Sequence, residues 1–110
     1  MKKPKIVVLH NSECEFWQEA VLEAKKALIS SGMQLWVEII EVKSPNDAKK
    51  YKFSGSPQVN VNGKDVDPEA KNVKKPSLKT CRPYTWGGKS FDYPPKEMIL
   101  AALQTLKTNH

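Results

Sequence analysis

The sequence is poor in cysteine and in long apolar runs, and each shortage excludes a class of protein. Two cysteines in 110 residues are too few for the disulfide scaffold of a small secreted domain, and their spacing matches no zinc site. No apolar run approaches the roughly 20 residues that cross a bilayer. Only four apolar residues, 6–9, follow the N-terminal lysines, too few for a signal peptide. We therefore expect a cytoplasmic protein, not attached to a membrane, whose cysteines rest as thiols.

Arginine is also scarce, which bears on the excess of positive charge. The net charge is +6, yet Arg82 is the only arginine among 18 basic residues. Arginine is the usual reader of bases and phosphates, whereas surplus lysine is also an ordinary way of staying soluble. The composition therefore argues against nucleic acid as a partner.

The apolar content that is present suffices for one folded domain covering residues 1–110, because 39% of the residues are hydrophobic. Residues 6–9 form a continuous apolar run, typical of a strand covered on both faces and central in its sheet. Residues 15–31 follow with a helical period that Asn11 or Ser12 can cap and Gly32 ends. Residues 35–42 form a second strand, which predicts a right-handed crossover and a parallel pair.

The second half alternates shorter elements. Residues 44–47 open a short helix, and residues 58–66 form a hairpin around Asn62-Gly63. Residues 67–80 form a loop without period, and residues 85–93 a mobile stretch whose aromatic residues form a lid or cover the core. Pro94-Pro95 starts the last helix. The aromatic residues of the 85–93 stretch are Trp86, Phe91 and Tyr93. The buried stripe expected in the last helix is Ile99, Ala102, Leu103 and Leu106, with Met98 beside it.

Cys14 lies between the first strand and the first helix, a position at which a thiol can be reactive. The positive end of the helix dipole favours its thiolate, while Glu13 and Glu15 oppose ionisation. Cys14 is a candidate nucleophile or soft-metal ligand. His10 is either a proton donor or metal ligand beside it or a packed strand-end residue. Cys81 is either a second reactive thiol or a small half-buried residue.

The element order, strand-helix-strand-helix-strand-strand-helix, together with Cys14 at the first junction and Ser56-Pro57 before the third strand, resembles the thioredoxin and glutaredoxin superfamily. The resemblance covers almost the whole chain. It implies an α/β thioredoxin-like fold, a four-stranded mixed sheet with helices on both faces. It also implies a cis Ser56–Pro57 bond near Cys14 that offers backbone groups to an extended substrate.

A finer resemblance is to a small prokaryotic thioredoxin-like group that has a Gly-Ser-Pro hairpin, here from Gly55, and a Cys-Arg-x-Tyr segment, here from Cys81. The chain departs from the dithiol pattern of that superfamily, because Trp17 stands where Cys-x-x-Cys would place its second cysteine. Within that motif a two-thiol cycle is excluded. Cys14 is then either a single reactive thiol or a relic, and Trp17 is either core or one wall of a ligand groove.

The resemblance implies a possible thiol–disulfide oxidoreductase in which Cys14 attacks and either Cys81 or an external thiol such as glutathione resolves. Ser56, Pro57 and Trp17 are then the substrate-binding residues, no cofactor is expected, and the partner is a protein or small molecule bearing a thiol or disulfide. One alternative is a binding module without turnover that uses the Cys14/Pro57 groove. Another is binding of a soft metal, mercury or copper. Whether Cys14 and Cys81 meet, and the oligomeric state, stay open.

Overall fold

The computed structural model of the chain describes residues 5–33, 36–68 and 80–108. Most of the predicted 67–80 loop lies outside these ranges. Along the chain the elements are β1 (Lys5–His10), α1 (Trp17–Ser31), β2 (Trp36–Glu41), α2 (Pro45–Lys50), β3 (Gln58–Val61), β4 (Lys64–Asp65), β5 (Tyr84–Trp86), β6 (Lys89–Phe91) and α3 (Lys96–Thr108). The described residues thus form a mixed α/β structure.

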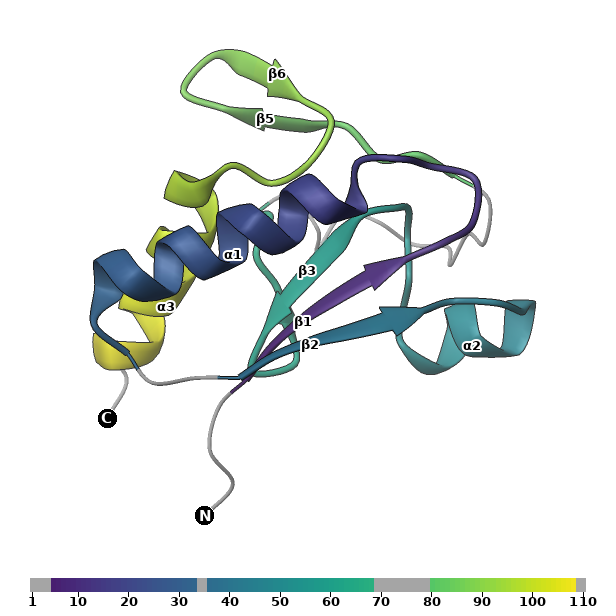
Figure 1. Cartoon of the computed structure of the whole chain (residues 1–110), viewed down its shortest axis with the longest axis horizontal. Helices are drawn as coiled ribbons and strands as arrows, with labels where there is room; N and C mark the ends of the chain where they lie inside the picture. Colours follow the sequence, from purple (N-terminus) through teal and green to yellow (C-terminus); the bar gives the residue numbers. More distant parts are fainter. Residues whose placement is uncertain (1–4, 34–35, 69–79, 109–110) are drawn as a thin grey trace.

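A four-stranded mixed sheet in the described residues organises this structure, with strand order β2-β1-β3-β4. β1 pairs in parallel with β2 and antiparallel with β3, as Figure 1 shows. The central place of β1 confirms the prediction from its continuous apolar run, since an interior strand is covered on both faces. The parallel pair of β1 and β2 across α1 is confirmed as well.

Alternate residues of β1 enter two separate cores. Ile6 and Val8 pack in the larger core with α1 and α3, whereas Leu9 packs with Ala48 of α2 and Phe53. Because successive strand residues point to opposite faces, helices cover both faces of the sheet, as predicted. α1 and α3 contact each other, and Figure 1 shows the short α2 near the carboxyl ends of β1 and β2.

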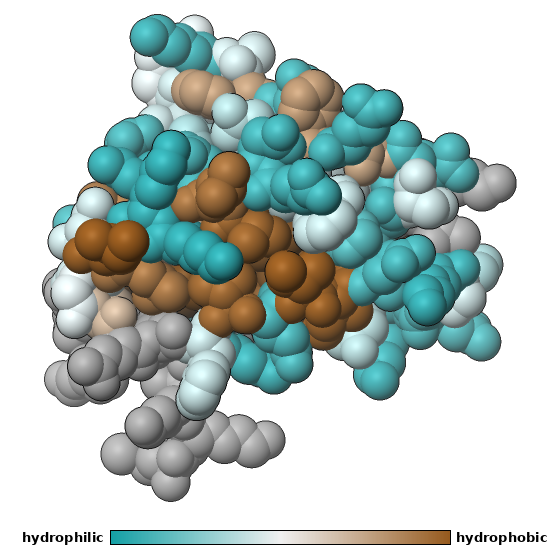
Figure 2. All heavy atoms as spheres, in the orientation of Figure 1, coloured by the Kyte–Doolittle hydropathy of each residue, from teal (hydrophilic) through white to brown (hydrophobic). Residues whose placement is uncertain are grey.

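β2 lies at one edge of the sheet, so its apolar residues are only partly covered. Trp36 is 71% exposed and Ile39 is 47% exposed. Figure 2 shows hydrophobic side chains gathered over α1 and β2 on the face toward the viewer. The strand was predicted from its apolar residues on both faces, but its position at the edge depends on pairing that the pattern does not encode.

The start of α1 corrects one prediction. Neither Asn11 nor Ser12 caps the helix, because its N-cap is Phe16, which makes no side-chain capping bond. The Asn11 side chain instead accepts hydrogen bonds from residues before the helix, described below. Gly32 ends α1 in the left-handed region with φ of 71°, which confirms the predicted stop.

Two hairpins follow α2, one predicted and one missed. Asn62 and Gly63 have φ of 52° and 83°, as the predicted hairpin turn requires. No strands were predicted at 85–93, yet β5 and β6 pair there around Gly87-Gly88; the mobility of this stretch stays a prediction. Strands of three residues are too short to show a period. The predicted aromatics Trp86, Phe91 and Tyr93 pack against the larger core, so the covering role is confirmed.

The last helix agrees with its predicted stripe. α3 begins directly after Pro94-Pro95, and Met98, Ile99 and Leu103 are fully buried. The Leu106 side chain lies outside the described residues. α3 and α1 together close the larger core over the sheet.

Tyr84 of β5 ties the second hairpin to the sheet. Its ring is 1% exposed, and its hydroxyl donates a hydrogen bond of 2.5 Å to the carbonyl oxygen of Pro57. Burial raises the pKa of Tyr84 above its ordinary value of 10.0, although the neighbouring Arg82 opposes this shift. The fold therefore requires the protonated phenol.

This requirement predicts alkaline instability. Because the folded-state pKa of Tyr84 is raised, its contribution to the free energy of unfolding is full below pH 10 and is lost as pH rises above it, at about 1.4 kcal/mol per pH unit. Tyr84→Phe should remove this slope and cost about 1–3 kcal/mol at pH 7, since the Pro57 carbonyl loses its donor. Urea unfolding between pH 7 and 10.5 measures both. Tyr51→Phe is the control, and equal alkaline slopes in wild type and Tyr84→Phe would contradict the prediction.

Candidate functional site

A disulfide joins Cys14 to Cys81 across 67 residues of sequence. Their Cα atoms are 5.7 Å apart, inside the range in which disulfides form. The question of whether the two cysteines meet is thereby answered. The expectation that both rest as thiols is wrong for this structure. That expectation came from the reducing compartment assumed for the chain, and the local spacing gave no sign that Cys81 would lie against Cys14.

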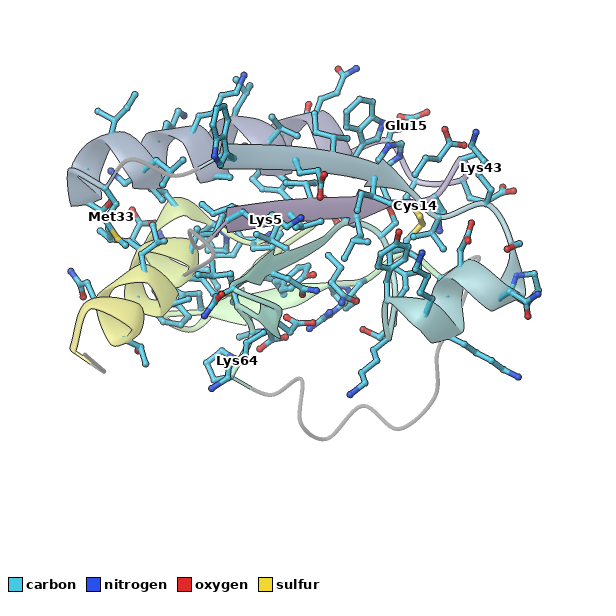
Figure 3. The ribbon with its side chains drawn as sticks, turned by 90° about the horizontal axis from the view of Figure 1, so that it is seen from below. Lys5, Cys14, Glu15, Met33, Lys43 and Lys64 are labelled. Atoms are coloured by element: carbon cyan, nitrogen blue, oxygen red, sulfur yellow. A yellow bond between two sulfur atoms is a disulfide. The ribbon has the colours of Figure 1, made fainter. Side chains whose placement is uncertain are left out.

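Cys14 is positioned by the turn between β1 and α1. The Asn11 side-chain oxygen accepts hydrogen bonds from the backbone N–H groups of Glu13 and Cys14, each 3.0 Å long. This pattern is an Asx turn, which is why an asparagine suits the end of the strand. Cys14 is 7% exposed, and Figure 3 shows it near the carboxyl end of β1 with Glu15 on the adjoining loop.

Cys81 is positioned by its backbone neighbours, which pair with Ser56. The Ser56 N–H donates to the Thr80 carbonyl over 2.8 Å, and the Arg82 N–H donates to the Ser56 carbonyl over 3.0 Å. The Asn11 amide nitrogen also donates to the Thr80 carbonyl, over 3.3 Å. The two flanking residues are therefore anchored, and the cysteine between them faces Cys14.

The predicted cis Ser56–Pro57 bond is confirmed. Both backbone groups of Ser56 that were expected to hold a substrate are bound here by the chain's own residues, Thr80 and Arg82. The substrate-binding roles of Ser56 and Pro57 stay predictions.

Arg82 secures this segment from its other side. The guanidinium is 7% exposed and forms a paired contact with Asp65, with Nη1–Oδ2 and Nη2–Oδ1 distances of 2.6 and 3.1 Å. Nη2 also lies 3.2 Å from Asp67 Oδ2, and Nη1 donates to the Ser54 hydroxyl over 2.9 Å. The guanidinium carbon lies 4.7 Å from the centre of the Tyr84 ring. The sole arginine is thus a buried anchor between the β3–β4 hairpin and Cys81.

The neighbours of Arg82 keep its guanidinium positively charged. Burial by itself lowers the pKa of Arg82, but the hydrogen bond with Asp65, the adjacent Tyr84 and the hydrogen bond with Asp67 together raise that pKa above its ordinary value. A planar guanidinium matches a carboxylate at two points, so a lysine would not reproduce this contact.

Gly55 allows the segment to approach. A side-chain carbon built on Gly55 would lie 2.7 Å from Cβ of Arg82, and the glycine has φ of 153°, a region that other residues rarely adopt. The glycine before Ser56 is therefore needed for the close contact with Arg82.

His10 and Trp17 lie beside this corner but pack on each other. Their rings stack with centroids 4.2 Å apart and planes 12° apart, and His10 is 8% exposed. Trp17 also packs against the larger core. This geometry agrees with the packed interpretation of both residues, and a chemical role for His10 or a groove wall at Trp17 stays a prediction.

A pocket of about 430 Å³ opens at the disulfide. Cys81 is exposed on it whereas Cys14 is nearly covered. No group of three or more histidine, cysteine, aspartate or glutamate side chains able to hold a metal occurs within the described ranges. The residues that line the pocket are Glu13, Cys14, Glu15, Phe16, Ser56, Cys81, Arg82, Pro83 and Asp92.

Sequence reasoning missed the supporting residues Asn11, Asp65 and Asp67 and the anchoring role of Arg82. A signal was present, since the only arginine directly follows a cysteine and the Asp-Val-Asp run at 65–67 ends the hairpin. Pairing them required knowing that the two segments lie together.

Comparison with known families identified a matching family model. The model of a family described as a domain of unknown function, DUF2703, matches residues 11–103. No curated protein matches the chain. Within the described part of the chain, every helix is too short or too polar to cross a membrane.

The buried ion pair predicts a stability difference. Asp65→Asn removes the two-point carboxylate partner of Arg82 and leaves Asp67 as its remaining carboxylate contact. The change should lower the free energy of unfolding by about 3 kcal/mol, because the buried guanidinium loses its shorter and better-aligned ion pair. Glu38→Gln is the control, since it removes the exposed Lys5–Glu38 pair, 3.0 Å long, and should cost less than about 1 kcal/mol. Urea unfolding of the oxidised proteins measures both. Equal, small losses would show that Asp65 does not hold Arg82.

Proposed function

The chain belongs to the DUF2703 family, and we propose that in this member the Cys14–Cys81 bridge is the reversible centre of a thioredoxin-like thiol–disulfide oxidoreductase. The observation that carries the proposal is the bridge itself, formed between a nearly buried and an exposed cysteine at an open pocket. Exposed disulfides are the ones most readily exchanged, whereas structural bridges are usually enclosed.

The arrangement around the bridge supports the thioredoxin-like assignment. Cys14 lies at the β1–α1 junction, a cis-proline follows Ser56 beside it, and the sheet order is β2-β1-β3-β4. The mixed four-stranded sheet and the cis bond are features that the resemblance implies, and Cys14 at the first junction is one of the features on which the resemblance rests. The β5–β6 hairpin is an addition to the expected order.

The exposures favour Cys81 as the sulfur that meets the partner. A partner thiolate attacks the sulfur of Cys81, a new disulfide forms between partner and Cys81, and the Cys14–Cys81 bond breaks. Cys14 departs as a thiolate with the bonding electron pair. A second thiolate of the partner then attacks the partner sulfur that is bonded to Cys81. The partner thereby gains an internal disulfide and Cys81 leaves as a thiolate, so both cysteines of this chain end reduced.

Cys14 is suited to the leaving position. It lies just before α1, where the helix dipole stabilises a thiolate, and a better-stabilised thiolate leaves faster. Glu13 and Glu15 oppose this effect. The sequence alone suggested Cys14 as the attacking thiol and Cys81 as the resolving one. We propose the reverse division: when the cycle runs backwards, the Cys81 thiolate attacks a partner disulfide, one partner sulfur leaves as a thiolate, and Cys14 then attacks Cys81 to release the second partner thiolate and re-form the bridge.

The contacts on either side of Cys81 favour re-forming the bridge within the same chain. The backbone bonds of Thr80 and Arg82 to Ser56, and the ion pair of Arg82, are made by atoms other than the two sulfurs, so we expect them to persist after reduction. The reduced thiols therefore stay opposite each other, and their high effective concentration favours closing the bridge again.

The alternatives have less support. A binding module that uses the Ser56 backbone would first have to displace the chain's own Thr80–Arg82 contacts. Mercury or copper(I) would find two sulfurs only after reduction. Neither alternative explains why the bridge faces an open pocket.

Single-cysteine variants test the division of roles. Cys14→Ser leaves the exposed Cys81 thiol, and Cys81→Ser leaves the covered Cys14 thiol. At equal thiolate concentration, we expect Cys14→Ser to form a mixed disulfide with 5,5′-dithiobis(2-nitrobenzoate) about tenfold faster than Cys81→Ser, because access controls exchange. Absorbance of the released thiolate gives both rates. Faster reaction of Cys81→Ser would reverse the assignment.

Turnover tests the function itself. Wild-type protein should reduce a low-molecular-weight disulfide catalytically when a dithiol regenerates it. In a single turnover without the dithiol, reduced wild-type protein should release both product thiols, whereas reduced Cys14→Ser should stop at the mixed disulfide on Cys81 because it has no internal thiol to displace the second product. A wild-type bridge that neither opens with a dithiol nor accelerates reduction would rule out an oxidoreductase. Mass spectrometry of digests identifies which cysteine holds the partner.

A further inference from the structure

From the charges at the pocket mouth, we infer that the protein exchanges disulfides with a protein partner whose reacting cysteine is flanked by lysine or arginine. This inference rests on the proposed function and adds the class of substrate. It depends on three kinds of group that line the same pocket as the exposed residue Cys81: carboxylates, a neutralised guanidinium and an aromatic side chain.

Three exposed carboxylates line the mouth, those of Glu13, Glu15 and Asp92. They come from two segments that are distant in the sequence: the β1–α1 turn supplies the glutamates, and the residue after β6 supplies the aspartate. A thiol that approaches the bridge through this pocket therefore meets negative charge from both segments.

The cation among the described lining residues does not offset this charge. Arg82 is 7% exposed, and its guanidinium is engaged by Asp65 and Asp67 over 2.6 to 3.2 Å. One positive charge facing two carboxylates leaves that cluster net negative. The charge of the described residues that line the pocket is thus opposite in sign to the net charge of +6 of the chain.

Phe16 adds a surface that suits long basic side chains. Phe16 lines the pocket and is 42% exposed, and its ring centroid lies 6.3 Å from that of Tyr93. Lysine and arginine carry an apolar stem and a cationic end, which pack well on an aromatic face beside carboxylates. The aromatic ring of Phe16 and the carboxylates of the pocket thus both favour lysine or arginine in the partner.

The chemistry of exchange strengthens the preference. An attacking thiolate is itself negative, so carboxylates repel it unless the partner brings positive charge. Glutathione carries two carboxylates and one ammonium group and is net anionic at neutral pH, so the mouth disfavours it. A cysteine between basic residues is attracted instead, and the attraction acts mainly on the rate of association.

Matched peptides test this inference. The probes are acetylated, amidated Lys-Cys-Lys, Gln-Cys-Gln and Glu-Cys-Glu, each used to reduce the bridge of the wild-type protein, with rates expressed per thiolate. At 20 mM salt we expect Lys-Cys-Lys to react about thirtyfold faster than Glu-Cys-Glu, with Gln-Cys-Gln between them. At 0.5 M salt the ratio should fall to about threefold, because salt screens exposed charges.

Two charge-matched variants locate the effect. Glu13→Gln/Glu15→Gln should reduce the low-salt ratio to about fivefold or less. Glu38→Gln/Glu41→Gln removes the same charge from β2, outside the pocket lining, and should leave the ratio near that of wild type. A ratio that responds equally to both pairs would overturn the inference, because net charge alone would then explain it.

The outcomes separate this inference from the proposed function. Equal rates for the three peptides, or the fastest rate for Glu-Cys-Glu, would overturn the basic partner and leave disulfide exchange standing. Failure of all three peptides, and of dithiothreitol, to open the bridge would overturn both.

Discussion

The buried contact between Arg82 and Asp65 is the interaction on which the arrangement of the site depends. It joins the end of the β3–β4 hairpin to the segment that carries Cys81, and Ser54 and Tyr84 pack on the same guanidinium. A buried ion pair adds little net stability compared with apolar packing, because both charges lose their water. What it supplies is position, since a planar, two-point contact allows few orientations. Here the position that it sets is that of the exposed sulfur.

The local elements were predictable, because their signals lie within a few residues of one another. The apolar run 6–9 indicated a central strand, Asn62-Gly63 a tight turn and Pro94-Pro95 a helix start, and each is found. The β5–β6 hairpin was not predictable from period, since each strand has three residues. The start of α1 was misjudged because Asn11, a good capping residue, bonds the turn before the helix instead.

The site was predictable only in part, because its contacts join distant segments. Cys14 and Ser56-Pro57 were found through a pattern of elements. The partner of Cys14 lies 67 residues away, and nothing in either neighbourhood records the other. Composition was misleading in the same way: a net charge of +6 describes the whole surface, whereas the carboxylates of Glu13, Glu15 and Asp92 gather at one pocket. Chemistry responds to the local field, which depends on folding.

Trp17 explains why the sulfur that pairs with Cys14 comes from a distant segment. A cysteine at that position would lie three residues from Cys14, and the two thiols would stay close through the covalent chain alone. Trp17 instead stacks on His10 and packs against the core, so the second sulfur must come from a separate segment. Contacts with Asn11, Ser56, Asp65 and Asp67 hold that segment near Cys14. The effective concentration of the two thiols is therefore set by non-covalent contacts, and any change that loosens Arg82 must also weaken the tendency of the bridge to close.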